Sequence, residues 1–254
     1  MNETHPQCLF GIHPVLEALK TGQRRFYKIV IAKEKSGPKF RALLDLARTR
    51  NVRVELLPRS VFDQKYRSFS HQGVVGYVSV KETLDLPQLV AEARRASSHP
   101  VLVLLDELQD PHNVGAIIRS AEGLGLQGVV VTKHRAAPLG ETVAKCSAGA
   151  LERLPVACVT NLARAMENLK QDQFWIVGLD RNAEHSCHGF HFPFPCALVI
   201  GGEERGIRPG LKKLCDFMVS IPMAGTIDSL NASAAAAVIF YEVLRQRKSH
   251  PSKP

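Results

Sequence analysis

Hydrophobic and polar positions alternate along the chain in two successive series. In the first series, three apolar runs have the length and the β-branched content of strands, and they are 26–32, 52–56 and 73–80. Three segments repeat apolar residues at helical spacing, and they are 13–22, 37–51 and 59–66. Pro14 stands early in the first of these helices, and Gly22 is placed to end it. The pattern predicts a small α/β sandwich of about 75 residues.

The second series begins at Val101 and repeats strand and helix more regularly. Its predicted strands are 101–106, 128–132, 154–158, 174–179, 196–201 and a short one near 217–221. Its predicted helices lie near 113–124, 139–149, 160–170 and 230–247. Alternation of this kind is typical of a mainly parallel sheet that helices cover on both faces.

A polar stretch with one short predicted helix separates the two series. We therefore divide the chain into a basic α/β domain (6–81), a linker (82–99), a second α/β domain (100–248) and a tail (249–254).

Net charge separates the same two parts. Residues 1–81 hold 15 Lys and Arg against 6 Asp and Glu, whereas residues 82–254 hold 18 against 18, so the whole excess of +9 lies in the first part. A basic domain beside a neutral one favours a polyanionic partner, because Lys and Arg contacts to phosphates release counterions. A solvated basic surface that aids solubility accounts for the charge equally well.

Targeting and metal signals are weak. The longest wholly apolar run, 234–241, is too short for a bilayer, and the first 25 residues lack an apolar signal segment. Six cysteines without a CxxC pair suit a reducing, cytoplasmic compartment. The stretch 185–196 gathers metal-ligating residues in a spacing that fits no regular zinc pattern, and they are His185, Cys187, His188, His191 and Cys196. We therefore expect no metal.

The sequence "GLGLQG" (123–128) matches G-x-G-x-x-G but in the reverse context. In a dinucleotide fold this loop follows a strand and opens a helix. Here it follows a helix and opens a strand. Gly123 or Gly125 is then expected at the helix C-cap, and Gly128 in the turn.

Three later segments carry candidate chemistry. After the apolar strand 101–106, we expect Asn113 to cap a helix and Arg119 to lie over the small residue Gly115, where its guanidinium reaches the helix start. An ion pair with a nearby acid is the alternative for Arg119. "VIGGEERGI" (199–207) is a strand that enters a glycine-rich turn, which lets a ligand approach the backbone. "IPMAGTIDSLNASAAAA" (221–237) places Asp228, Ser229 and Asn231 at the start of an almost wholly apolar helix.

Together these segments resemble the three motifs of the SpoU (TrmH-like) RNA ribose 2′-O-methyltransferases of the SPOUT superfamily. The likeness covers essentially the whole chain, because "GIHPVLEAL" (11–19) and "SHQGVVGYV" (70–78) resemble the ribosomal-protein-like RNA-binding domain of one branch. That branch methylates a guanosine in the peptidyl-transferase loop of bacterial 23S ribosomal RNA.

The resemblance implies a fold that general rules would exclude, since chains rarely knot. It implies a mainly parallel α/β methyltransferase domain with a deep trefoil knot, which binds S-adenosyl-L-methionine and packs as a homodimer. The implied reaction-site residues are Arg119, Asn113, Glu203, Ser229 and Asn231. The implied cofactor contacts are Gly201, Ile221, Leu230, Gly178 and Leu179. The implied partner is 23S rRNA or a ribosome assembly intermediate, without DNA or membrane.

The chain departs from the family pattern at two places. Glu204 stands where the second motif usually has glycine, and "GIHPV" replaces the commoner "GRNPV". Both departures leave the reaction type intact and bear on the substrate. Transfer RNA, another ribosomal site, or non-catalytic RNA binding remain alternatives.

Overall fold

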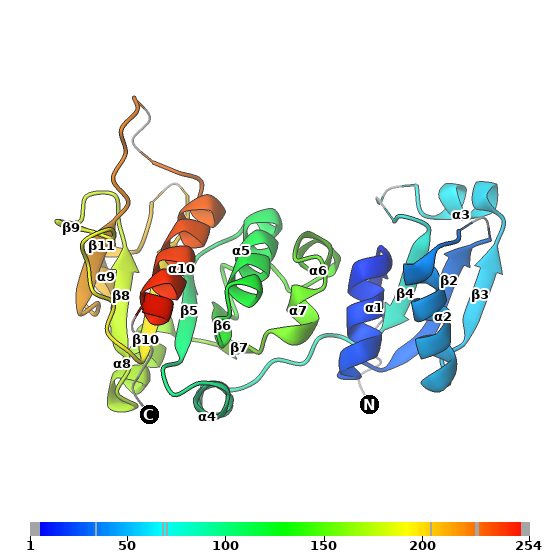
Figure 1. The fold of residues 1–254 in the computed structure, drawn as a ribbon, viewed down its shortest axis with the longest axis horizontal. Coiled ribbons are helices and arrows are strands. Elements are labelled where there is room, and N and C mark those ends of the chain that lie inside the picture. Colours follow the sequence, from blue (N-terminus) through cyan, green and yellow to red (C-terminus); the bar gives the residue numbers. More distant parts are fainter. Residues whose placement is uncertain are drawn as a thin grey trace. The chain divides into compact units, whose positions relative to one another are not determined.

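The computed structural model describes residues 6–249 except 34, 68, 70, 204, 227 and 228. The chain forms two units, which Figure 1 draws with their element labels. Unit 1 contains the residues up to Glu82 together with Pro138–Arg153. Unit 2 contains Thr83–Ala137 together with the residues from Leu154 onward.

Unit 1 is built on a four-stranded sheet of order β1-β4-β2-β3, in which only β2 and β3 are parallel. Its strands are β1 (Gln7–Phe10), β2 (Phe26–Ala32), β3 (Val54–Leu57) and β4 (Val74–Val78). Its helices are α1 (Ile12–Thr21), α2 (Pro38–Thr49), α3 (Arg59–Lys65), α6 (Glu141–Cys146) and α7 (Ala150–Arg153). The predicted helices and strands of the first series are confirmed, and β1 is an additional strand.

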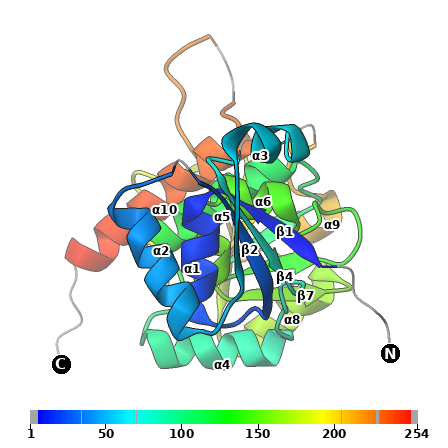
Figure 2. The same cartoon turned by 90° about the vertical axis from the view of Figure 1, so that its right-hand side faces the viewer.

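Helices pack on this sheet as the apolar spacing predicts. Helices α1 and α2 run side by side, as Figure 2 shows, and α1 ends at Gly22 in the left-handed conformation (φ 66°). Around α3, Phe62 and Tyr66 close a separate aromatic cluster over Phe10.

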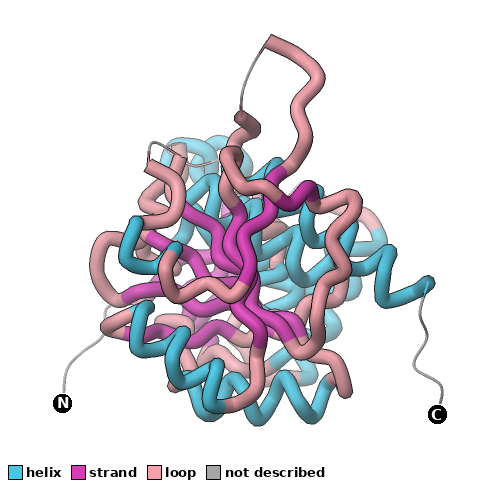
Figure 3. Tube along the Cα trace, turned by 90° about the vertical axis from the view of Figure 1, so that its left-hand side faces the viewer, coloured by secondary structure: helices cyan, strands magenta, loops and turns pink. Residues whose placement is uncertain are grey.

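Unit 2 is built on a seven-stranded sheet of order β7-β6-β5-β10-β8-β11-β9, and every strand pair in it is parallel. Its strands are β5 (Val101–Asp106), β6 (Gly128–Thr132), β7 (Val156–Val159), β8 (Trp175–Leu179), β9 (His185–Ser186), β10 (Cys196–Gly201) and β11 (Phe217–Ser220). Its helices are α4 (Leu86–Ala96), α5 (Pro111–Gly123), α8 (Leu162–Gln171), α9 (Pro209–Lys212) and α10 (Ala232–Ser249). The predicted parallel α/β fold is confirmed, with helices on both sides of the strands (Figure 3). None of the described helices combines the length and apolarity that a bilayer crossing requires.

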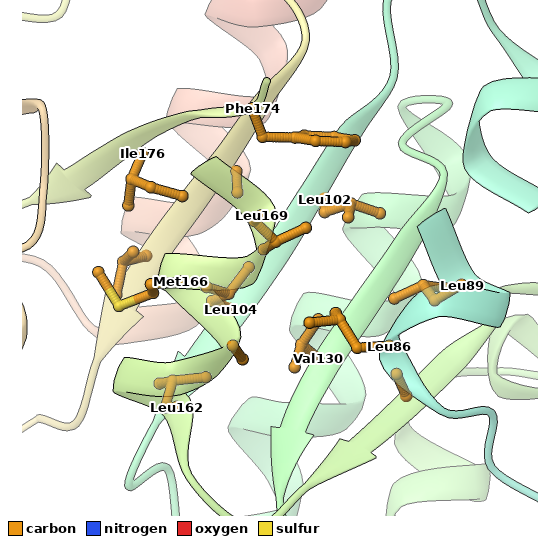
Figure 4. Close-up of a cluster of buried hydrophobic side chains, with 14 of the residues drawn as sticks. Leu86, Leu89, Leu102, Leu104, Val130, Leu162, Met166, Leu169, Phe174 and Ile176 are labelled. Atoms are coloured by element: carbon orange, nitrogen blue, oxygen red, sulfur yellow. The ribbon is translucent and has the colours of Figure 1, made fainter. Parts of the chain in front are cut away.

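The core on one face of this sheet includes the segment expected to act as linker. Leu86 and Leu89 of α4 pack with Leu102, Leu104 and residues of α8 in one buried cluster (Figure 4). A capping box fixes the start of α4, since the Asp85 side chain accepts from the backbone of Gln88 and the Gln88 side chain accepts in return. Residues 85–96 therefore belong to the core of unit 2. On the opposite face, α5 packs against α10.

Two local features differ in detail from the prediction. Gly128 is the first residue of β6, in agreement with the predicted strand 128–132 and not with its assignment to the preceding turn. A Cβ at this position would lie 2.5 Å from Leu89 Cδ1 of α4, which favours glycine there. The helix predicted near 139–149 is shorter, since α6 ends at Cys146, and Ala148 (φ 52°) and Gly149 (φ 95°) separate it from a second short helix, α7, at Ala150–Arg153. Both short helices pack in unit 1.

Candidate active site

The carboxyl ends of the central strands of unit 2 bring distant loops together. Gly201, the last residue of β10, lies opposite Asp106, the last residue of β5. The loop that enters α5 and the turn 202–208 therefore begin side by side, as parallel strands require.

The N-cap of α5 lies three residues earlier than predicted. Asp110 is its N-cap and accepts from His112 N at 2.9 Å, and Pro111 occupies the first helical position. The predicted role of Asn113 as N-cap was therefore wrong. Asn113 lies in the first turn with only 6% of its surface exposed, and this burial requires partners for its amide.

Those partners come from both later motifs. The Asn113 amide nitrogen donates to Glu203 Oε1 at 2.6 Å and to Asp110 Oδ2 at 3.0 Å. Asn231 Nδ2 donates to the same Glu203 oxygen at 2.5 Å and to Asn113 Oδ1 at 2.9 Å. Asn113, Glu203 and Asn231 thus form one hydrogen-bonded cluster, although Glu203 and Asn231 lie 90 and 118 positions after Asn113 in the sequence. Asn231 also accepts from the Ser233 backbone and hydroxyl, so it caps α10 while it joins the cluster.

The turn after β10 is tight because of its glycines. A Cβ on Gly201 would lie 2.1 Å from the carbonyl carbon of Gly206, so the turn folds directly back on the strand end. Gly206 has φ 62°, and its N–H donates to Gly202 O at 2.9 Å. Gly201 is therefore required by the backbone of the turn itself.

A cavity of about 260 Å³ opens beside this turn. Its walls include four of the five expected cofactor contacts and two expected reaction-site residues, which are Gly201, Ile221, Leu230, Leu179, Glu203 and Ser229. The described part of the loop between β11 and α10, which supplies Ile221, Ser229 and Leu230, extends away from the strands (Figures 1 and 3).

Sequence reasoning missed Asp180 and Lys212, which also line the cavity and form an ion pair. Asp180 directly follows β8. Because ligands bind at the carboxyl ends of parallel strands, this position could have identified it as a candidate. Burial raises the pKa of Asp180, but hydrogen bonds from Lys212 and from the backbone N–H of Asn182 outweigh it and hold the pKa below its ordinary value.

The structure places other predicted residues elsewhere. Gly178 lies within the sheet, where a Cβ would be 2.6 Å from Met218 Sδ, and it is not among the residues that line the cavity. Arg119 is exposed on α5, and no residue in the described part of the chain forms a hydrogen bond or ion pair with it. Glu204 and Asp228 lie outside the described residues.

The 185–196 stretch does not gather as a metal site. Among the described residues, no three His, Cys, Asp or Glu side chains group closely enough to hold an ion. Cys196 is instead buried in β10, where burial raises its pKa to about 12.

The chain matches two family models over most of its length. Residues 100–241 match the SpoU rRNA Methylase family, and residues 8–84 match the RNA 2′-O ribose methyltransferase substrate binding family.

Named proteins and solved structures agree with these matches. A Bacillus subtilis protein named for the TrmH family of tRNA/rRNA methyltransferases is 40% identical over 97% of this chain and 98% of its own. The 23S rRNA (guanosine-2′-O-)-methyltransferase of Salmonella typhimurium is 37% identical over 95% of this chain and 99% of its own. The crystal structure of the SpoU methyltransferase AviRb from Streptomyces viridochromogenes, solved with AdoMet, superposes with a TM-score of 0.81 at 29% identity. It covers 96% of this chain and 92% of that one. The chain therefore belongs to the SpoU rRNA methylase family and is an RNA methyltransferase.

Proposed function

We propose that the protein transfers a methyl group from S-adenosylmethionine to the ribose 2′-hydroxyl of a guanosine in the peptidyl-transferase loop of 23S rRNA, in the cytoplasm. The observation that carries this proposal is the cluster of Asn113, Glu203 and Asn231 beside the cavity that Gly201, Ile221 and Leu230 line. Relatives named for this rRNA activity, at 36–37% identity over 95% of the chain, support the choice of substrate.

The cavity suits this cofactor chemically. Ile221, Leu179 and Leu230 offer apolar surface to an adenine, and we expect backbone groups of the described residues in the 221–230 loop to bind its edge. Asp180 and Glu203 place carboxylates in the same wall, which suits the positive sulfonium and amino groups. When bound, S-adenosylmethionine supplies an electrophilic methyl group. A trefoil knot in the C-terminal part of unit 2 belongs to the same proposal.

The chain's own residues have separate tasks in this proposal. A ribose hydroxyl is a poor nucleophile, so the site must stabilise its deprotonated form. Arg119 stabilises the emerging 2′-alkoxide and anchors a neighbouring phosphate, because a guanidinium stays protonated and offers a planar set of donors. Glu203 accepts from both amides and so fixes the positions of Asn113 and Asn231, and Ser229 lines the cavity beside them.

We further propose that the enzyme is a homodimer that packs through α10. Ala234, Val238 and Tyr241 form an exposed apolar stripe at helical spacing, and Tyr241 is 61% exposed. A stripe of this kind on a terminal helix is typical of a covered surface.

Mapping ribose methylation across total RNA from a deletion strain tests the substrate. We expect one 2′-O-methyl mark in 23S rRNA to disappear and to return with the parent gene but not with Arg119→Ala. Loss of a mark in transfer RNA or at another ribosomal site would instead assign that RNA. An unchanged map, together with no heat of S-adenosylmethionine binding, would leave a non-catalytic RNA-binding protein.

Arg119→Lys tests the role of the guanidinium. The variant keeps the charge and loses the forked donors, so we expect turnover to fall about 100-fold while cofactor affinity is retained. Near-normal turnover in this variant would exclude the role.

A further inference from the structure

Asp106, at the carboxyl end of β5, carries a wholly buried carboxylate outside the proposed reaction cluster. Its surface is 0% exposed. Both oxygens are bound by Arg208: the backbone N–H donates to Oδ2 at 2.9 Å, Nε donates to Oδ1 at 2.8 Å, and Nη2 lies 2.7 Å from Oδ1. A buried charge needs such pairing, because an unpaired carboxylate would be costly to desolvate.

This ion pair closes the turn that carries Glu203. The turn leaves the sheet at Gly201, which lies opposite Asp106, and its last residue, Arg208, returns to the same Asp106. Between these two points, the hydrogen bond from Gly206 N to Gly202 O and the buried Ile207 fix its course. Asp106 thus lies at both ends of the segment on which Glu203 stands: its backbone pairs in register with Gly201, and its carboxylate binds Arg208.

Glu203 needs such restraint, because its Oε1 atom alone accepts hydrogen bonds from two amides that lie outside the turn. Asn113 and Asn231 approach that oxygen at 2.6 and 2.5 Å. These distances leave little room for the turn to move without loss of one of the two hydrogen bonds.

We propose that Asp106 and Arg208 are a positioning pair for methyl transfer: they hold the 202–208 turn so that Glu203 meets Asn113 and Asn231. The proposal rests on the proposed function. It assigns no contact with substrate or cofactor to either residue. Arginine suits the task because its forked donors and backbone N–H engage both carboxylate oxygens, whereas a lysine side chain would place one ammonium group there.

A second arginine provides a matched control. Arg135 Nη1 lies 3.1 Å from Glu107 Oε1, and Arg208 Nη1 lies 3.2 Å from the same oxygen. Arg135 is 72% exposed and does not belong to the turn. Its removal takes one positive charge from the same neighbourhood and leaves the Asp106 pair intact.

The test compares Arg208→Ala, Arg208→Lys and Arg135→Ala in the full-length protein. Methylation kinetics give kcat and the KM for RNA, and hydrogen exchange followed by mass spectrometry gives the protection of residues 201–208. For Arg208→Ala we expect a fall in kcat of about 100-fold, with KM for RNA within threefold, because small displacements of reacting groups cost about that much. We expect exchange to quicken in 201–208 and to stay unchanged in α8. Added guanidinium ion should restore part of the rate, Arg208→Lys should keep an intermediate rate, and Arg135→Ala should stay within twofold of the parent.

Normal kcat and normal protection of 201–208 in Arg208→Ala would overturn the proposal, and so would an equal loss in Arg135→Ala. If Arg208→Ala does not fold, the same two measurements on Arg208→Lys decide, and a parent-like result there overturns the proposal. If the parent protein methylates no RNA, the proposed function fails, and the exchange experiment still tests whether the pair holds the turn.

Discussion

At the residue scale, both donors of the Asn113 amide and its acceptor oxygen are engaged. Its nitrogen donates to Asp110 and Glu203, and its oxygen accepts from Asn231. Only an uncharged group with two donors and one acceptor can stand between two carboxylates and another amide without repulsion. The residue type is therefore dictated by its neighbours.

Asn113→Asp tests this requirement. The change adds a carboxylate of the same shape within hydrogen-bonding distance of Asp110 and Glu203, so two attractive contacts become repulsive. We expect methyl transfer to fall at least about 100-fold, as for the loss of a well-placed donor. Asn161→Asp is the control, because Asn161 caps α8 by accepting from Arg164 N and aspartate caps equally well. Equal activity of the two variants in a methylation assay would contradict the assignment.

Gly201→Ala tests the tight turn. The new Cβ would lie 2.1 Å from the Gly206 carbonyl carbon, so backbone must shift. We expect destabilisation of about 3 kcal/mol or more and loss of cofactor affinity by calorimetry, since the turn also lines the cavity. Gly123→Ala, at a helical position with nothing within 4 Å, should instead stabilise by about 0.5–1 kcal/mol. A Gly201→Ala protein with parental cofactor affinity would refute the steric argument.

At the element scale, buried strands were the most predictable parts of the chain. The runs 101–106, 128–132 and 196–201 coincide with β5, β6 and β10, because strands covered on both faces must be apolar throughout. The N-cap of α5 was predicted three residues late, since Asp110 and Asn113 are both good caps. Pro111 at the first helical position was the deciding signal.

Packing between distant segments was not predictable from periodicity. The spacing of apolar residues predicted the helix α4, but no feature of the neighbouring sequence predicted that Leu86 and Leu89 lie in the core of unit 2. Likewise, only the family resemblance predicted that Asn113, Glu203 and Asn231 belong to one site. Their hydrogen bonds join residues 90 and 118 positions apart, which no local pattern encodes.

Helix α10 supports a prediction about assembly. Tyr241→Arg places a charge on its exposed apolar stripe, at the most exposed apolar position of the helix. If that stripe is the dimer contact, burial of an unpaired charge should separate the subunits. We expect light scattering to give twice 28.0 kDa for the parent and 28.0 kDa for the variant. Val61→Arg, at an exposed apolar position of α3, should stay dimeric. A parent protein of 28.0 kDa would remove the dimer from the proposal.

At the scale of the whole molecule, the division into units differs from the order of the sequence. Helices α6 and α7 follow β6 and precede β7 of unit 2, yet they pack with α1 and β1 of unit 1. The centre of this packing is Arg24 with Glu152, whose side chains are 1% and 0% exposed and which form two hydrogen bonds of 2.8 Å. Arg24 also donates to Gln7 Oε1 and Ser79 O.

Glu152→Ala should therefore destabilise unit 1 strongly. It leaves the Arg24 guanidinium buried with only its two neutral acceptors, and breaking a buried pair costs about 3–5 kcal/mol. The neighbouring pair of Arg153 with Glu17 is the control, since the Arg153 side chain is 49% exposed and Arg153→Ala should cost about 0–1 kcal/mol. Denaturant titration, with hydrogen exchange in 7–24 and 138–153, measures both losses of stability.

The double variant Arg24→Met, Glu152→Leu adds the decisive comparison, because an apolar pair of similar volume removes the desolvation cost along with the attraction. We expect it to recover most of the stability that Glu152→Ala loses. If the double variant does not recover this stability, the ion pair contributes more than the avoidance of an unpaired charge. If Glu152→Ala loses no more stability than Arg153→Ala, the ion pair does not hold α7 to the rest of unit 1.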